Sequence, residues 1–150
     1  MSFLIDNEFK KIKRKYNLTT PKDLLDQAHV GLLEIPLDDN TGGFTVTNNR
    51  CSTIVINSLW ESHYQAFVIL HEFAHHRLHG WSSTPFFRRV GVGDYTVPKI
   101  EREANELAMD ILLAMQNSDE INRLTKQQLI NYLGISPDLI NFIKWQYVQT

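Results

Sequence analysis

The sequence has almost no cysteine, no long apolar stretch and no excess of one charge. Cys51 is the only cysteine, so no disulfide can form within the chain, which is typical of a reducing compartment. The longest apolar runs, such as residues 66–70, are far too short to cross a bilayer. The first residues show no basic segment ahead of an apolar core, as a secretory signal would. We therefore expect a cytoplasmic protein with no membrane partner.

The charges nearly balance, with 15 Lys and Arg against 17 Asp and Glu and a formal net charge of −2. Such a chain has no general attraction to nucleic acids or anionic membranes. The one basic run, residues 10–15, is interpreted as the solvated face of a helix. A length of 150 residues, 43% of them hydrophobic, is typical of a single globular domain.

Apolar periodicity and turn residues predict an α+β fold. Two N-terminal helices are expected at 3–16 and 21–29, the second capped by Thr20 and ended by Gly31. Short strands at 32–37, 43–47 and 52–57 would form a small, mostly antiparallel sheet. Cys51, at the start of the last strand, is expected in the core.

The remainder of the chain is predicted to be mainly helical. Ser58-x-x-Glu61 is interpreted as a capping box for a helix over 59–78, which Gly80 would end. Further helices are expected from about 98 to 115, from 126 to 133 and from 137 to 147. Residues 81–99 are predicted to form a loop with a short strand near 95–97.

The helix predicted over 59–78 contains the pentapeptide HEFAH, which runs from His71 to His75. Two histidines four residues apart lie one above the other on a helix, so both imidazoles can reach one zinc ion. Glu72 projects toward the reacting water rather than toward the ion, and it can take a proton as the general base. The alternative is a histidine-rich surface helix without a metal.

A catalytic zinc ion usually has three protein ligands, and the third is expected from the segment EREANELA at 101–108. Glu101 lies on the apolar face of the helix predicted there, whereas Glu103, Glu106 and Asp110 share a polar face. Because a carboxylate aimed at the core needs a cation as partner, Glu101 is the predicted third ligand, and Glu103 is the alternative. Asn105, one turn after Glu101, is expected to hydrogen-bond a ligand histidine.

HEFAH, followed 26 residues after His75 by EREANELA, resembles the ImmA/IrrE-type metallopeptidases. In that family an HExxH helix is followed by an E-x-E-A-N/D-x-F-A helix; Leu107 stands here where phenylalanine is common. The resemblance implies a zincin-like metallopeptidase domain over residues 1–117, which would bind one zinc ion. A helical extension over residues 118–150 would pack on this domain. It also implies an endopeptidase whose protein substrate is a transcriptional repressor of a phage or mobile element.

Other residues are weaker candidates for a role in the site. His79 is expected to orient the site or to cap the C-terminus of the helix, with a role as fourth ligand as the alternative, and His63 is expected to be structural. Tyr95, Arg88 and Arg89 are candidates for stabilising the transition state. The aromatic residues Trp81, Phe86 and Phe87 would line a substrate groove or anchor the loop.

Two other functions compete with hydrolysis. One is a non-catalytic, zinc-stabilised regulator that binds a repressor or an antitoxin. Glu72 argues against it, because a purely structural zinc ion needs no base. The other is a DNA-binding regulator with a vestigial metal site, since residues 125–136 resemble a helix-turn-helix. The following segment, PDLINFIKWQY, has little basic character, so DNA binding is not expected.

Overall fold

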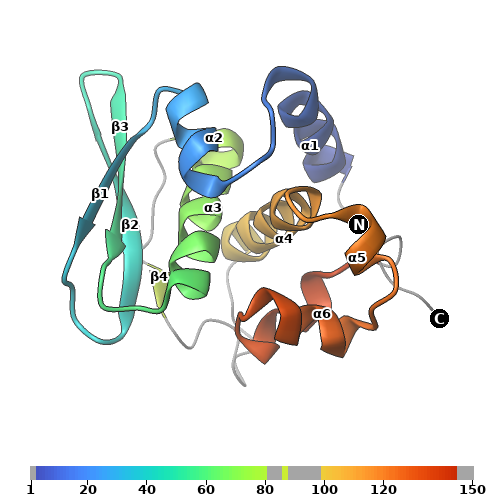
Figure 1. Ribbon diagram of the computed structural model, residues 1–150. Coiled ribbons are helices and arrows are strands. Elements are labelled where there is room, and N and C mark those ends of the chain that lie inside the picture. Colours follow the sequence, from blue (N-terminus) through green and yellow to red (C-terminus); the bar gives the residue numbers. More distant parts are fainter. Residues whose placement is uncertain (1–2, 81–85, 88–98, 145–150) are drawn as a thin grey trace.

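The computed structural model describes residues 3–80, 86–87 and 99–144, and it has the mixed α+β character predicted from the sequence. A long helix, α3 (Ser62–His79), lies at the centre of the molecule. A four-stranded sheet packs against one side of α3, and α4 (Lys99–Ala114) packs against another side (Figure 1). No helix of the described residues is long and apolar enough to cross a membrane.

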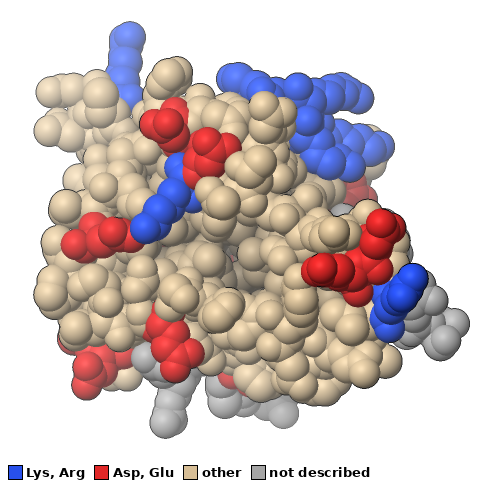
Figure 2. Space-filling model, in the orientation of Figure 1, with Lys and Arg blue, Asp and Glu red and all other residues tan. Residues whose placement is uncertain are grey.

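The two N-terminal helices form largely as predicted. Helix α1 (Phe3–Lys15) buries Ile5, Phe9 and Ile12. The basic residues of positions 10–15 are exposed, and Figure 2 shows Lys and Arg side chains gathered over α1. Helix α2 (Pro21–Gln27) is capped by the Thr20 side chain. It ends earlier than predicted, because His29 adopts a left-handed backbone with a φ of 58°, and Gly31 begins the first strand instead.

The sheet consists of β1 (Gly31–Ile35), β2 (Thr41–Asn48), β3 (Cys51–Asn57) and β4 (Phe86–Phe87), in the order β1-β3-β2-β4. A two-residue turn at Asn49 and Arg50, both with positive φ, joins β2 and β3 into an antiparallel hairpin. Strand β2 pairs antiparallel with β3 and β4, and β1 pairs in parallel with β3. The expected mostly antiparallel sheet is therefore present, with one parallel pair that was not predicted.

Cys51 was expected in the core, and this prediction is wrong. Its side chain is exposed. Cys51 directly follows the hairpin turn, where the neighbouring residues 48–50 are also exposed. The buried part of β3 begins after it and includes Ile54, Val55 and Ile56.

Helix α3 is buried over nine consecutive residues, from Phe67 to His75. It begins at Ser62 with Glu61 as N-cap, and Glu61 makes no side-chain capping bond. The predicted capping box at Ser58 and Glu61 is therefore wrong. The predicted end of the helix is confirmed, because Gly80 is its C-cap, with a φ of 64°.

The C-terminal part of the described chain packs on α4. It comprises α5 (Ser118–Ile121), α6 (Lys126–Leu133) and a 3-10 helix, η1 (Pro137–Phe142). Helix α6 has the predicted bounds, α5 was not predicted, and η1 is shorter than the helix expected at 137–147, whose last residues lie outside the described part. Buried apolar residues of this segment, including Ile121, Leu129 and Leu139, belong to the same core as the other helices and the sheet.

Candidate metal centre

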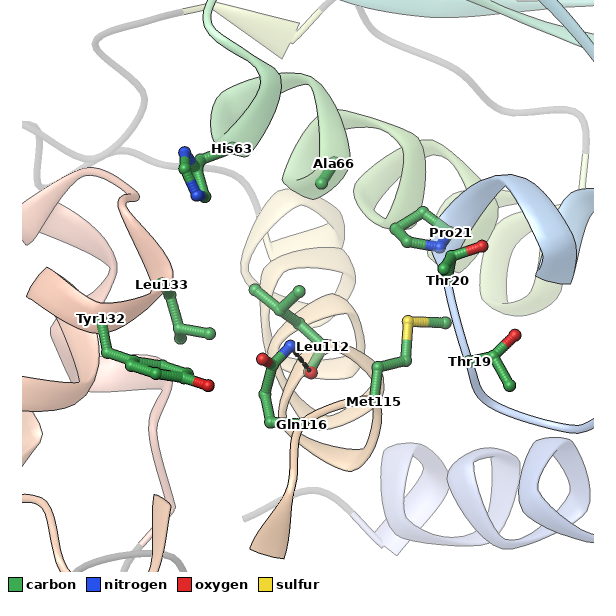
Figure 3. Close-up of a pocket in the computed structure, with 10 residues that line it drawn as sticks. All are labelled: Thr19, Thr20, Pro21, His63, Ala66, Leu112, Met115, Gln116, Tyr132 and Leu133. Carbon is green, nitrogen blue, oxygen red and sulfur yellow. Dashed lines mark hydrogen bonds between the residues drawn. The ribbon is translucent and has the colours of Figure 1, made fainter. Parts of the chain in front are cut away.

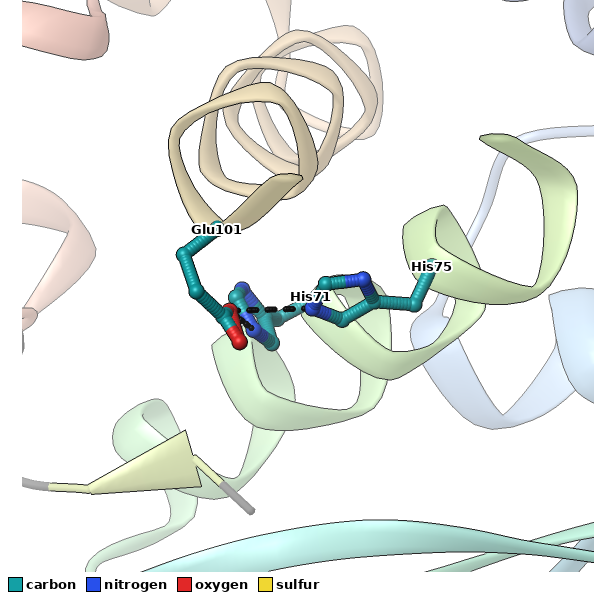
Figure 4. A group of neighbouring side chains, drawn as sticks. All are labelled: His71, His75 and Glu101. Carbon is teal, nitrogen blue, oxygen red and sulfur yellow. Dashed lines mark hydrogen bonds and ion pairs between the residues drawn. The ribbon is translucent and has the colours of Figure 1, made fainter. Parts of the chain in front are cut away.

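Three side chains from two helices meet in the interior beside α3. His71 and His75 project from α3, and Glu101 projects toward them from the first turn of α4 (Figure 4). The Oε2 atom of Glu101 lies 3.0 Å from Nε2 of His71 and 2.9 Å from Nε2 of His75. All three residues are buried. The predicted grouping of two histidines with Glu101 is therefore present.

The outer nitrogen of His71 has the partner that the sequence predicted. Nδ1 of His71 lies 2.8 Å from Oδ1 of Asn105, one turn after Glu101 on α4. Because an amide oxygen only accepts a hydrogen bond, Nδ1 of His71 carries the hydrogen. In a neutral imidazole Nε2 then holds a lone pair, and this lone pair faces the Glu101 carboxylate.

The donor set fits a metal cation. A lone pair on Nε2 and a carboxylate oxygen repel each other unless a cation or a proton lies between them. The other oxygen of Glu101, Oε1, is buried and has no hydrogen-bond partner among the described residues. Ligand atoms around a tetrahedral zinc ion lie roughly 3.4 Å apart, so the 2.9–3.0 Å separations from Glu101 Oε2 need only a small opening to admit one.

The charge of Glu101 is stabilised by its two neighbours. Burial alone would raise the pKa of its carboxyl group. When these two rings are protonated, their hydrogen bonds and positive charge outweigh burial and lower this pKa to about 2. Glu101 is thus held as an anion, which is the form that binds a cation.

Glu72 has a polar partner that the sequence analysis did not identify. Its carboxylate is completely buried beside the cluster, and its Oε1 accepts a hydrogen bond of 2.7 Å from Oγ1 of Thr45. Thr45 belongs to β2, whereas Glu72 belongs to α3. This contact joins the sheet to the helix at the proposed base.

Glu103, the alternative third ligand, lies elsewhere. Its Oε1 is 3.0 Å from Nε2 of His79, and the group of potential metal ligands among the described residues does not include it. His79 in turn lies with its Nδ1 3.0 Å from Nδ1 of His75. His79 and Glu103 therefore lie outside the cluster, on the side of His75.

His63 lies in a different place, as expected from its distance along α3. It lines a pocket of about 310 Å³ between the start of α2, α3, the end of α4 and α6 (Figure 3). A Cβ atom at Gly134 would approach the His63 ring to 2.8 Å, so the imidazole packs closely on the end of α6. None of the three cluster residues lines this pocket.

Several candidates for substrate contacts lie outside the described residues. These are Trp81, Arg88, Arg89 and Tyr95, together with the side chains of Phe86 and Phe87. Their proposed roles in stabilising the transition state or lining a groove stay predictions.

Comparison with known proteins supports the resemblance inferred from the motifs. The model of a peptidase family, described as the IrrE N-terminal-like domain, matches residues 25–139. The matched range contains the sheet, both helices of the cluster and α6. No curated protein and no solved structure matches the chain.

Proposed function

This chain belongs to the peptidase family of the IrrE N-terminal-like domain, and from this membership we propose that it is a zinc-dependent endopeptidase. The family supports a metallopeptidase-type function. The observation that carries the proposal is the buried cluster of His71, His75 and Glu101 beside a buried Glu72. The domain would be zincin-like, with the metal between its two long helices.

His71, His75 and Glu101 would hold the ion. Two neutral imidazoles and one carboxylate are a common protein donor set for catalytic zinc, which leaves a position for water or substrate. When bound, zinc would supply Lewis acidity, which polarises a peptide carbonyl and lowers the pKa of water. Manganese and iron accept similar ligands, so the metal analysis of the purified protein measures all three metals.

Glu72 would move the proton. It directly follows His71 on α3, and Thr45 donates a hydrogen bond to its Oε1. The carboxylate would accept a proton from the attacking water and deliver it to the nitrogen of the departing amine. A positioned general base of this kind typically contributes a hundredfold to ten-thousandfold in rate.

The substrate we propose is a transcriptional repressor of a phage or mobile element, cleaved in the cytoplasm. The support for this substrate is the ImmA/IrrE resemblance of the HEFAH and EREANELA segments. Cleavage would allow transcription of the genes that the repressor controls. An enzyme dedicated to one partner protein would act only weakly on generic peptides.

The test compares the wild type with Glu72→Gln in the host cell. Newly formed protein N-termini are labelled and identified by mass spectrometry, and zinc is measured in both purified proteins. We expect cleavage products only with the wild type, and about one zinc ion per chain in both proteins, because Gln keeps the shape of the side chain but is not a base.

Two outcomes contradict the proposal. The same termini in both strains would show that Glu72 is not the base. A Glu72→Gln variant that retains zinc and the full biological effect would show that hydrolysis is not the function, and the chain would then be a zinc-stabilised regulator.

A further inference from the structure

A chain of three side chains runs from α4 to the second histidine of the cluster. Glu103 Oε1 lies 3.0 Å from His79 Nε2, and His79 Nδ1 lies 3.0 Å from His75 Nδ1. The side chains of His79 and Glu103 are only 11% and 14% exposed. These contacts therefore lie mostly out of water, where the direction of each hydrogen bond matters.

The direction of each bond follows from the chemistry of the acceptor at the end of the chain. An ionised carboxylate only accepts hydrogen bonds, so the hydrogen between Glu103 and His79 belongs to His79 Nε2. A neutral His79 then has a lone pair on Nδ1. Two lone pairs cannot form a hydrogen bond, so beside a neutral His79 the donor is His75 Nδ1. In a neutral His75 the remaining nitrogen, Nε2, then has a lone pair that faces Glu101.

We propose that Glu103 and His79 are positioning residues, which fix His75 in the tautomer whose Nε2 can bind a metal ion. The proposal rests on the proposed metal site, although not on the reaction carried out there. Asn105 has the same effect on His71 through a single contact. Helix α4 thus supplies the carboxylate of the cluster, the amide that contacts His71, and Glu103, which acts on His75 through His79 of α3.

The same contacts place His79 outside the group of potential ligands. Its Nε2 lies beside Glu103 and its Nδ1 beside the outer nitrogen of His75, whereas the candidate ligand atoms meet at Nε2 of His71, Nε2 of His75 and Glu101. Among the described residues, the group that could hold an ion does not include His79. A site with three protein ligands keeps an open position for substrate, which a fourth histidine would close.

Removing the carboxylate at position 103 should allow His75 to adopt both of its neutral tautomers. In Glu103→Met, His79 can place its hydrogen on Nδ1, where it would oppose the N–H of His75. His75 would then populate the form with hydrogen on Nε2, which cannot bind a metal. Loss of such an outer partner typically lowers metal affinity tenfold to a hundredfold. Glu103→Gln still offers a carbonyl oxygen to His79 and should stay within a few-fold of the wild type.

Two measurements test the proposal. The first is zinc affinity of the wild type, Glu103→Met and Glu103→Gln by competition with a chromophoric chelator. The second is the ¹⁵N chemical shifts of the imidazole nitrogens in the zinc-free proteins, which report the tautomer of His75 directly. The matched control is Arg77→Met. It removes a partly buried ion pair between α3 and Glu8 of α1 and leaves His79 in place.

The expected result is an Nδ1–H tautomer of His75 in the wild type and in Glu103→Gln, with mixed tautomers and weaker zinc binding in Glu103→Met only. An Nε2–H tautomer of His75 in the wild type would overturn the proposal without any variant. So would equal zinc affinity in all three proteins, or an equal loss in Arg77→Met, which would indicate a general role in packing. If the wild type binds no zinc, the proposed function fails, whereas the tautomer measurement still decides this inference.

Discussion

Among single residues, Glu72 and Thr45 illustrate how the site depends on parts of the chain that are distant in sequence. Glu72 follows His71 on α3, yet the hydroxyl that holds its carboxylate comes from β2. A hydrogen bond to a charged group contributes about 1.5–3 kcal/mol. Thr45 therefore orients the proposed base with an energy large enough to affect a reaction rate.

We predict that Thr45→Val lowers kcat/KM for cleavage by roughly tenfold or more, because valine has the shape of threonine but cannot donate a hydrogen bond. Thr45→Ser, which keeps the hydroxyl, should retain most of the activity. The measurement is cleavage of a peptide that spans the bond identified in the cell, together with the zinc content of each protein.

Thr47→Val is the control for this pair of variants. Thr47 lies on the same face of β2, and its hydroxyl contacts Ser52 rather than Glu72. An equal loss of activity in Thr47→Val would show that the strand, rather than the hydrogen bond to Glu72, determines the effect.

Helical periodicity was sufficient to identify the residues of the cluster but not Thr45. His71 and His75 share a face because they are four residues apart, and Glu101 lies on the buried face of its own helix. Thr45 is one of several threonines in a strand 27 residues before Glu72. Nothing in its local sequence shows that β2 will pack against that point of α3.

At the scale of elements, the turn before α3 shows why the predicted capping box does not form. Ser58-x-x-Glu61 has the composition of a capping box, but Ser58 donates its backbone N–H to Ile35 at the end of β1. The side chain of Asn57 accepts hydrogen bonds from the backbone of Leu37 and Leu59. These contacts tie the turn to the sheet, so the helix begins only at Ser62.

Strand β2 approaches β3 and α3 closely at Gly43. A Cβ atom at Gly43 would lie 2.5 Å from the carbonyl oxygen of Val55 in β3 and 2.8 Å from the side chain of Val68 in α3. Because neither can move without shifting an element, Gly43→Ala should lower the free energy of unfolding by about 1–3 kcal/mol. Urea denaturation followed by circular dichroism measures this change.

Val46→Ala serves as the comparison for Gly43→Ala. Val46 belongs to the same strand, but its side chain is 47% exposed, so the expected loss is below about 1 kcal/mol. If Gly43→Ala costs no more than Val46→Ala, the contact between the sheet and α3 is looser than the geometry indicates.

At the scale of the whole molecule, an ion cluster around the buried Lys144 and Asp110 joins distant parts of the sequence. Lys144, after η1, donates to Asp110 of α4 at 2.6 Å and to Asp6 of α1 at 2.9 Å. Burial alone would lower the pKa of Lys144, but its hydrogen bonds and charge interactions with these carboxylates raise it. Burial raises the pKa of Asp110 to about 6, although the hydrogen bond from Lys144 opposes this.

The raised pKa of Asp110 predicts how stability depends on pH. Between pH values of about 4 and 6 the folded chain binds a proton at Asp110 that the unfolded chain does not. This contribution to stability is therefore present at low pH and is lost as the pH rises through about 6. The free energy of unfolding of the wild type minus that of Asp110→Asn should increase by about 1 kcal/mol from pH 7 to pH 5.

Urea denaturation of both proteins at the two pH values provides this double difference. The histidines and Glu101 are present in both, so their titration cancels. A difference that shrinks toward pH 5 would mean that Lys144 holds Asp110 as an anion, with its pKa lowered rather than raised.

The error over Asp110 also shows which part of the fold the sequence could not predict. Periodicity within α4 placed Asp110 on a polar face with Glu103 and Glu106, and in the folded chain it is completely buried. Its carboxylate is paired there with Lys144, 34 residues later. The helices, the strands and the metal motifs have local signals, whereas such long-range pairs, and the parallel pairing of β1 with β3, do not.

The distance along the chain between His75 and Glu101 has a consequence for the time at which the proposed metal site can form. While the protein is being synthesised, a chain that ends within α3 has both imidazoles but lacks the carboxylate and the groups on α4 that set the tautomers. The ion-binding arrangement is complete only when α4 has been made and has docked. Under the proposed function, a nascent chain would therefore be inactive as a protease until α4 has been synthesised and has packed against α3.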